Sequence, residues 1–356
     1  MTHCRLRRVR EILSNRKLEG FIVTNRLNVR WLVGFTGSNG AVLLTEDQLY
    51  LFTDSRYEIQ SAEQAPDARI TISNDAVSLQ AARKASQLGL KTVGFEADDL
   101  TVSAHKAMKA ELPGTSLRAT QSIVSRLRYV KSPEEIDKIR RAVQITDAAY
   151  NTLLGSIKPG VSEKDLAAEL AYTLKKNGAE SESFPSIVAS GERSALPHAV
   201  PTDATLVVGT QVLMDFGGQY EGYAGDMTRT VFLGKATDKF RDIYNIVLDA
   251  QLAAISGVAP GKSGKEIDAI ARDYIASHGY EDAFQHSLGH SIGLDVHDGA
   301  ALSPRSELIL EPGMVVTVEP GIYLEGWGGV RIEDDILVNE TGYENLTGST
   351  KSLLEL

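Results

Sequence analysis

Four carboxylates and one imidazole in the C-terminal half of the chain have the types and spacing of metal ligands. Asp215 and Asp226 flank the glycine-rich segment FGGQYEGYAG, and Glu319 and Glu333 flank PGIYLEGWGGVRI; His290 lies between the two pairs. Such an oxygen-rich set suits two divalent cations of the manganese or cobalt type better than a structural zinc ion, which favours Cys and His. The sequence therefore predicts a dinuclear metal hydrolase.

The pairing of these acids matters more than any one of them, because a single Asp or Glu is most simply a turn or surface residue. Asp215 ends the apolar run 212–214, where an unpaired carboxylate would be costly to bury. Asp226 follows across a glycine-rich turn. If the flanking strands pair, both carboxylates reach one face, and Glu319 and Glu333 repeat the arrangement with a longer hairpin.

Histidines cluster near these acids. His198 precedes Asp215 by 17 residues, and His286, His290 and His297 fall within twelve positions of a glycine-punctuated segment. We interpret this group as ligands or proton-transfer groups, whereas the isolated His3 and His278 are expected to be structural.

Arginine is also present beside one of the predicted ligands. Arg331 precedes Glu333 by two residues, so on a strand it points to the same face. It either orients a carboxylate or is a surface charge.

A weak internal repeat organises this part of the chain. The segment IKPGVS at 157–162 recurs as VAPGKS at 258–263, and each precedes an amphipathic helical pattern. The segment 209–217 likewise matches 313–321, and both place a carboxylate six residues after a glycine. The offsets are 101 and 104 residues. Two similar halves would each contribute one carboxylate hairpin to a site on a pseudo-two-fold axis.

The N-terminal part has a different pattern. Short apolar runs at 20–25, 41–46, 49–54, 70–74 and 92–96 alternate with helical patterns near 56–65, 77–88 and 103–112, which indicates an α/β domain. Ser132, Pro133 and Glu135 form a strong helix start with a capping box. We predict two domains, 1–130 and 131–356.

Composition excludes several classes of protein. The net charge of −10 and the pI near 5.3 argue against nucleic acid or an anionic membrane as a partner. Cys4 is the sole cysteine, so an internal disulfide and a cysteine-based zinc site are excluded. There is no signal-peptide pattern and no run of 18 apolar residues, so the cytoplasm is the expected location.

The segments MDFG, GDMTRT, SLGHSIGLDVHD, VEPGIY and RIEDD closely resemble the metal-dependent pita-bread peptidases that act on Xaa-Pro bonds, aminopeptidase P and prolidase. The segment NVRWLVGFTGSNGAVLLTEDQLYLFTDSRY resembles the creatinase-type N-terminal domain common to them. The resemblance covers nearly the whole chain. It implies an α/β creatinase-like domain followed by an α+β pita-bread catalytic domain with an internal pseudo-two-fold repeat.

The resemblance also implies a role for each matching residue. Asp215 would bind one metal, Asp226 and Glu333 would bridge two, and His290 and Glu319 would complete the second site. The expected cofactor is a pair of divalent ions, most simply Mn²⁺, with Co²⁺ or Zn²⁺ as alternatives. Glu319 would also exchange the proton of the attacking water. The remaining expected functional residues are His198, His286 and His297 for substrate and proton handling, Arg331 just outside the ligands, and Tyr323.

Several activities are compatible with this family. We favour an aminopeptidase P acting on peptides with proline second, with a prolidase restricted to dipeptides as the main alternative. Methionine aminopeptidases share the ligands but usually lack the N-terminal domain, creatinase has replaced the ligands, and non-catalytic scaffolds of this fold have lost them. A homodimer or higher homo-oligomer is expected.

Overall fold

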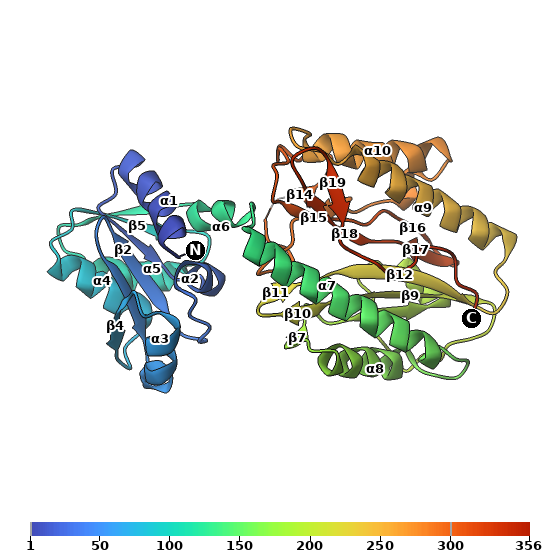
Figure 1. Ribbon diagram of the computed structural model, residues 1–356, viewed down its shortest axis with the longest axis horizontal. Coiled ribbons are helices and arrows are strands. Elements are labelled where there is room, and N and C mark those ends of the chain that lie inside the picture. The colour runs from blue at the N-terminus through green and yellow to red at the C-terminus, as the bar shows by residue number, and fades with distance from the viewer. Residues whose placement is uncertain (1, 300) are drawn as a thin grey trace. The chain divides into compact units, whose positions relative to one another are not determined.

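The computed structural model describes residues 2–299 and 301–356, which form two compact units, Met1–Arg128 and Tyr129–Leu356 (Figure 1). The sequence prediction placed the division after residue 130.

The first unit is built on a six-stranded sheet with the strand order β4-β3-β2-β1-β5-β6. Its strands β1, β2, β3 and β5 are the apolar runs of the sequence, and they are almost wholly buried. The structure has three elements that the sequence pattern did not predict, namely α2, β6 and α6. The elements are α1 (Thr2–Asn15), β1 (Gly20–Val23), α2 (Arg26–Val33), β2 (Ala41–Thr45), β3 (Leu49–Thr53), α3 (Glu58–Gln64), β4 (Arg69–Ile72), α4 (Val77–Gln87), β5 (Thr92–Glu96), α5 (Val102–Ala110), β6 (Ser116–Thr120) and α6 (Ile123–Arg128).

The second unit begins with the long helix α7, and the predicted capping box starts it. The Ser132 side chain accepts from the Glu135 backbone N–H, and the Glu135 carboxylate accepts from the Ser132 N–H. Ser263 and Glu266 form the same pair at the start of α10. The helices of this unit are α7 (Pro133–Leu153), α8 (Glu163–Lys176), α9 (Asp238–Gly257) and α10 (Gly264–Ser277).

Small antiparallel sheets carry the predicted ligands of the second unit. Strand β9 pairs with β8 and β12, and β15 pairs with β18, which pairs with β19; β16 and β17 form a hairpin. The strands are β7 (Ser181–Glu182), β8 (Ile187–Ser190), β9 (Thr210–Phe216), β10 (Gly218–Tyr220), β11 (Tyr223–Ala224), β12 (Met227–Leu233), β13 (Gly289–His290), β14 (Ala301–Leu302), β15 (Val315–Val318), β16 (Gly321–Leu324), β17 (Gly328–Arg331), β18 (Asp334–Val338) and β19 (Tyr343–Asn345).

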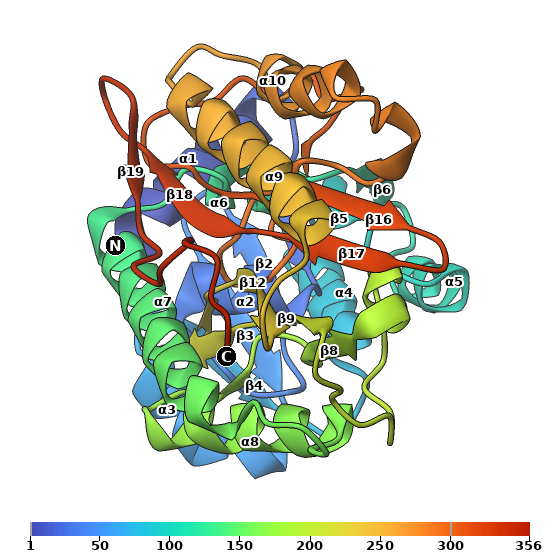
Figure 2. The same cartoon turned by 90° about the vertical axis from the view of Figure 1, so that its right-hand side faces the viewer.

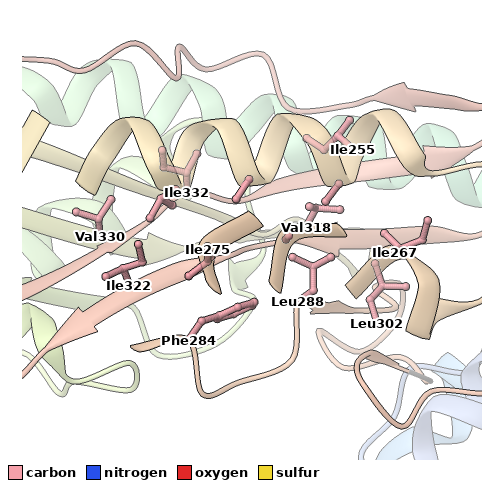
Figure 3. Packing of buried hydrophobic residues seen from close by; sticks show 14 of the residues in the cluster. Ile255, Ile267, Ile275, Phe284, Leu288, Leu302, Val318, Ile322, Val330 and Ile332 are labelled. Atoms are coloured by element: carbon pink, nitrogen blue, oxygen red, sulfur yellow. The ribbon is translucent and has the colours of Figure 1, made fainter. Parts of the chain in front are cut away.

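Each pair of helices covers one set of strands, as Figure 2 shows. Helices α7 and α8 share an apolar cluster with β9 and β12. Helices α9 and α10 share a second cluster with β15, β17 and β18, in which Ile255, Ile267, Val318 and Val330 are buried (Figure 3). The apolar face of each helix is thereby buried against the strands, and this packing stabilises the sheets that carry the predicted ligands.

The predicted internal repeat is visible in backbone hydrogen bonds. Gly160 N donates to Leu206 O at 3.0 Å, and Gly261 N donates to Leu310 O at 2.8 Å, with the same offsets of 101 and 104 residues that the sequence shows. The second unit therefore has the expected pita-bread architecture of two related halves. Among the described residues, no helix is long and apolar enough to cross a membrane.

Candidate metal centre

The two carboxylate pairs lie where antiparallel strands meet glycine-rich turns. Asp215 in β9 is opposite Thr228 in β12, and Asp226 directly precedes β12. A Cβ atom on Gly217 would come 1.7 Å from the carbonyl oxygen of Gly225. Only glycine fits there, which explains why the turn between the two acids can be so tight.

The second pair repeats this placement. Glu319 directly follows β15 and Glu333 directly precedes β18, and these two strands pair up to Val318 and Asp334. The Glu333 backbone N–H donates to Thr228 O at 3.1 Å, which joins the second hairpin to β12 of the first half. The four acids therefore converge from both halves.

The structure brings three of the predicted ligands together, and His290 is one of them. Donor atoms of Asp226, His290 and Glu333 all lie within 4.8 Å of one another. His290 Nε2 is 3.6 Å from Asp226 Oδ2 and 3.6 Å from Glu319 Oε1. Burial and the nearby His297 lower the pKa of His290 to about 4, so this imidazole is neutral near pH 7, as a metal ligand must be.

Arg331 connects the fifth predicted ligand to this group. Arg331 is 2% exposed, and its Nη2 donates to Asp215 Oδ2 at 2.6 Å. Nε donates to Thr228 Oγ1 at 3.0 Å, and the Thr228 hydroxyl donates to Glu333 Oε2 at 2.6 Å. Arg331 thus orients one ligand directly and is linked to another through Thr228.

Burial and mutual charge raise the pKa of three carboxyl groups of this centre, those of Asp226, Glu319 and Glu333. Burial, followed by the charge of Asp215, raises the pKa of Glu333 to about 8. Burial, followed by the charge of Glu333, raises the pKa of both Asp226 and Glu319 well above the ordinary values. A buried cluster of acids with one nearby guanidinium lacks positive charge.

Two carboxylate oxygens also lack partners. Asp215 Oδ1 and Asp226 Oδ1 are buried and have no hydrogen-bond partner among the described residues. Buried polar atoms are normally satisfied, so each such atom requires an explanation. Divalent cations fit both observations, since they would supply the missing charge and occupy the free oxygen lone pairs.

The other predicted residues lie around this centre. His286 Nε2 is 2.9 Å from the hydroxyl of Tyr323, and Tyr323 accepts from Arg331 Nη1 at 2.7 Å. Burial lowers the pKa of His286 to about 3, which keeps this imidazole neutral. The ring centroid of His297 lies 4.4 Å from that of His290. Both His198 and His297 are exposed to solvent.

Two adjoining cavities open onto the ligands. One of about 330 Å³ reaches all five predicted ligands and has an apolar wall that includes Phe184, Pro185, Ile187 and Val200. The other, of about 300 Å³, is lined by polar groups that include His286 and Arg331. His198 and His297 line both cavities.

Sequence reasoning missed two side chains that hold the ligands. Thr228 bonds to Glu333 as described, and Asp335 Oδ2 accepts from the Asp226 backbone N–H at 2.9 Å. Both lie in motifs that were singled out, GDMTRT and RIEDD. The motifs therefore contain both residues, but each bonds to a residue more than a hundred positions away, so no local pattern shows the contact.

Comparison with known proteins gives the family. Residues 137–340 match Metallopeptidase family M24, and residues 5–130 match the Creatinase/Prolidase N-terminal domain. The chain belongs to metallopeptidase family M24. The predictions of a metallopeptidase with a creatinase-type N-terminal domain and a pita-bread catalytic domain are therefore confirmed.

Relatives of this M24 chain are similar over essentially their whole length. The uncharacterized peptidase YqhT of Bacillus subtilis is 42% identical over 352 residues, covering 99% of this chain and 100% of the relative. The structure of an Xaa-Pro dipeptidase from Bacillus anthracis is also 42% identical, with a TM-score of 0.97 and full coverage of both chains. The X-Pro aminopeptidase of Thermotoga maritima is 36% identical, with a TM-score of 0.89, covering 96% of this chain and 99% of that one.

Proposed function

We propose that this chain is a dinuclear metal-dependent exopeptidase that hydrolyses the bond between an N-terminal residue and a following proline. The observation that carries the proposal is the convergence of Asp226, His290 and Glu333, with Glu319 3.6 Å from the same imidazole and two buried carboxylate oxygens lacking partners. Similarity to peptidases named for Xaa-Pro bonds supports the substrate class.

The proposed ligands match two divalent cations in charge. Four carboxylates, those of Asp215, Asp226, Glu319 and Glu333, would balance the four positive charges of two such ions, with His290 as the neutral fifth ligand. Two divalent cations bound there would supply a water of lowered pKa and positive charge for the scissile carbonyl oxygen. Oxygen-rich ligands favour manganese among the candidate ions.

The protein's own groups would orient the substrate and move the proton. Glu319 is the proposed acceptor of the water proton and its later donor to the leaving proline nitrogen, because its carboxylate borders both cavities. The imidazoles of His198 and His297 stand at the opening and can donate to the substrate carbonyl. Arg331 keeps the Asp215 carboxylate oriented through its 2.6 Å hydrogen bond.

Selection of proline follows from the apolar wall of the larger cavity. A proline ring has no N–H to satisfy and has a fixed φ, so a surface such as Phe184, Pro185 and Ile187 can bury it at little entropic loss. Val200, which lines the same cavity, is 74% exposed. On the strength of this exposed lining residue we place the aminopeptidase, which needs room for a chain beyond proline, as the first candidate.

A dipeptidase is the second candidate, and the name of the Bacillus anthracis relative favours it. The test is an assay of purified, metal-stripped protein with Mn²⁺ restored, on an Xaa-Pro dipeptide and on the same sequence extended by several residues. Cleavage of the extended peptide supports the aminopeptidase, and cleavage of the dipeptide alone supports the dipeptidase. Cleavage of neither would overturn the proposed Xaa-Pro activity.

Two substitutions test the metal-dependent mechanism itself. Asp215→Ala and Glu319→Ala should each abolish turnover while leaving the fold intact by circular dichroism. Bound manganese per chain should be two in the unchanged protein, measured by elemental analysis after dialysis. Normal activity in either variant would contradict the dinuclear mechanism.

A further inference from the structure

We propose that Glu163 is a positioning residue that holds His198 and the adjoining wall of the substrate cavities, although it touches neither substrate nor metal ligand. Glu163 is the first residue of α8 and lies 35 positions before His198 in the sequence. The inference rests on the proposed function, in which His198 contacts substrate.

The carboxylate of Glu163 closes a loop, residues 190–202, at both of its ends. It is fully buried, and Oε1 accepts from the backbone N–H of Ser190 at 2.9 Å. Oε2 accepts from the backbone N–H of Thr202 at 3.0 Å and from its hydroxyl at 2.8 Å. One side chain therefore fixes the point where the chain leaves β8 and the point where it returns.

Arg193 extends this anchor into the loop. Its Nε donates to Glu163 Oε2 at 3.0 Å, and its Nη2 donates to the carbonyl oxygen of Val200 at 2.7 Å. The first turn of the loop has other supports, because Ser194 Oγ accepts from Gln211 and from the backbone of Gly329. In the returning part, 196–201, Arg193 holds the Val200 carbonyl, and Ala199 packs in a buried apolar cluster with Ile187 and Leu213.

That returning part builds the site. His198 lines both cavities, and Ala199, Val200 and Pro201 line the larger one. The Pro197 carbonyl oxygen accepts from Arg331 Nη1 at 3.2 Å, so the loop also meets the guanidinium that orients Asp215. A displacement of this segment would move His198 and the apolar wall together.

The internal repeat shows that Glu163 is not needed for the backbone arrangement. Glu163 N donates to Ala204 O at 3.0 Å, and at the equivalent place in the second half Gly264 N donates to Leu308 O at 2.8 Å. Glycine suffices there because the neighbouring segment packs directly on it, and an added Cβ would lie 2.6 Å from Ser306 Oγ. The same junction therefore forms without a carboxylate. What Glu163 adds in the first half is an anchor for both ends of the loop that carries His198.

The charge of Glu163 suits its position. The first turn of a helix has free N–H groups and a partial positive charge, which stabilise a carboxylate there. The guanidinium of Arg193 supplies the opposite full charge, and its side chain is 33% exposed. Replacing the carboxylate by a methyl group would leave the donors of Ser190 and Thr202 without their acceptor.

The test compares Glu163→Ala and Glu163→Gln with the unchanged protein, using Lys164→Ala as the matched control. Lys164 joins α8 to Asp203, just beyond this loop, and both side chains are largely exposed. We expect Glu163→Ala to lower kcat/KM about 10- to 100-fold, mainly through KM, because displaced positioning groups weaken substrate alignment. Glu163→Gln, which keeps one acceptor oxygen, should recover part of the loss. Lys164→Ala should leave kcat/KM unchanged.

Two further measurements separate positioning from simple destabilisation. Manganese affinity of Glu163→Ala, by calorimetry, should stay within about twofold of the unchanged protein, since no proposed ligand touches Glu163. In a double-mutant cycle, Glu163→Ala should add little to His198→Ala, as expected for a residue that acts through another. Multiplying effects in the cycle, or a loss of manganese affinity that parallels a fall in Tm, would overturn the proposal.

Amide hydrogen exchange measures the order of the segment that carries His198 without any assay of activity. In Glu163→Gln, and in Arg193→Gln as a second variant, the amides of Leu196 and Ala199, which donate to Arg193 O and Leu196 O, should exchange faster while those of β9 and β12 stay protected. Failure of the unchanged protein to cleave any Xaa-Pro peptide would overturn the proposed function without changing this result. Unchanged exchange in 196–201 would overturn the positioning role even if the peptidase activity is found.

Discussion

Glu333→Gln is expected to stabilise the metal-free protein while it removes metal binding. Glu333 is 1% exposed, and burial together with Asp215 raises its pKa from 4.5 to about 8. A pKa that is higher in the folded state means that the folded chain loses stability as the pH rises from the unfolded value to the folded one. At pH 8 the metal-free protein has therefore lost nearly all of the stability that ionisation of Glu333 can remove.

The size of this effect follows from the pKa. A rise from 4.5 to about 8 corresponds to at most about 5 kcal/mol, and a proton on Asp226 or Glu319 relieves part of the same repulsion. We expect Glu333→Gln to gain about 2–5 kcal/mol at pH 8, or about 5–15 °C in Tm. Gln retains an oxygen that can accept from the Thr228 hydroxyl, so the fold loses little.

The assay is thermal unfolding at pH 5 and pH 8, with EDTA and with excess Mn²⁺. In EDTA the variant should be the more stable at pH 8, and the difference should shrink at pH 5. With Mn²⁺ the order should reverse, because binding to the folded state stabilises only the protein that keeps its ligands. Glu340→Gln, at an exposed position, is the control. A Tm for Glu333→Gln in EDTA at pH 8 that is equal to or below that of the unchanged protein would refute the reasoning.

Three further predictions concern two groups beside the proposed ligands and one buried carboxyl group of the first unit. Asp335→Ala removes the acceptor of the Asp226 N–H, so manganese affinity should fall about 10- to 100-fold by calorimetry, and unchanged affinity would contradict this role. Tyr323→Phe removes the hydroxyl that lies between His286 and Arg331. We expect the free energy of unfolding to fall by about 1 kcal/mol and kcat to fall while two metal ions stay bound. A normal kcat would contradict this prediction. Burial raises the pKa of Glu96 to about 7, so the free energy of unfolding of the first unit should fall by up to about 3 kcal/mol between pH 4.5 and 7. In Glu96→Gln this pH dependence of unfolding should be weaker. An unchanged pH dependence would contradict the prediction.

The parts of the fold that sequence patterns predicted are those with strong local signals. The buried strands β1, β2, β3 and β5 are continuous apolar runs, and the capping box at Ser132 begins α7 as expected. The missed strand β6 has the sequence SLRAT and is largely exposed at the edge of its sheet, so it lacks an apolar alternation. Helix α2 has only eight residues, too few to establish a helical period against the β-branched residues within it.

The acids that we propose as metal ligands have a related local signal. Each acid sits where an apolar strand meets a glycine-rich turn, and the repeat supplies the same signal twice. The supporting contacts carried no such signal, because they depend on how separate hairpins pack. Arg331 reaches Asp215 across 116 positions, and Glu163 reaches Arg193 and Thr202 across a loop whose path no local pattern specifies.

The two halves also orient each other's ligands, which explains why neither half alone defines the centre. Arg331 of the second half holds Asp215 of the first, and Asp335 of the second half accepts from the backbone of Asp226 of the first. In the opposite direction, Thr228 of the first half donates to Glu333 of the second. A slip between the halves would break all three contacts at once and separate the acids. These cross-half hydrogen bonds therefore hold the acids of both halves in one place.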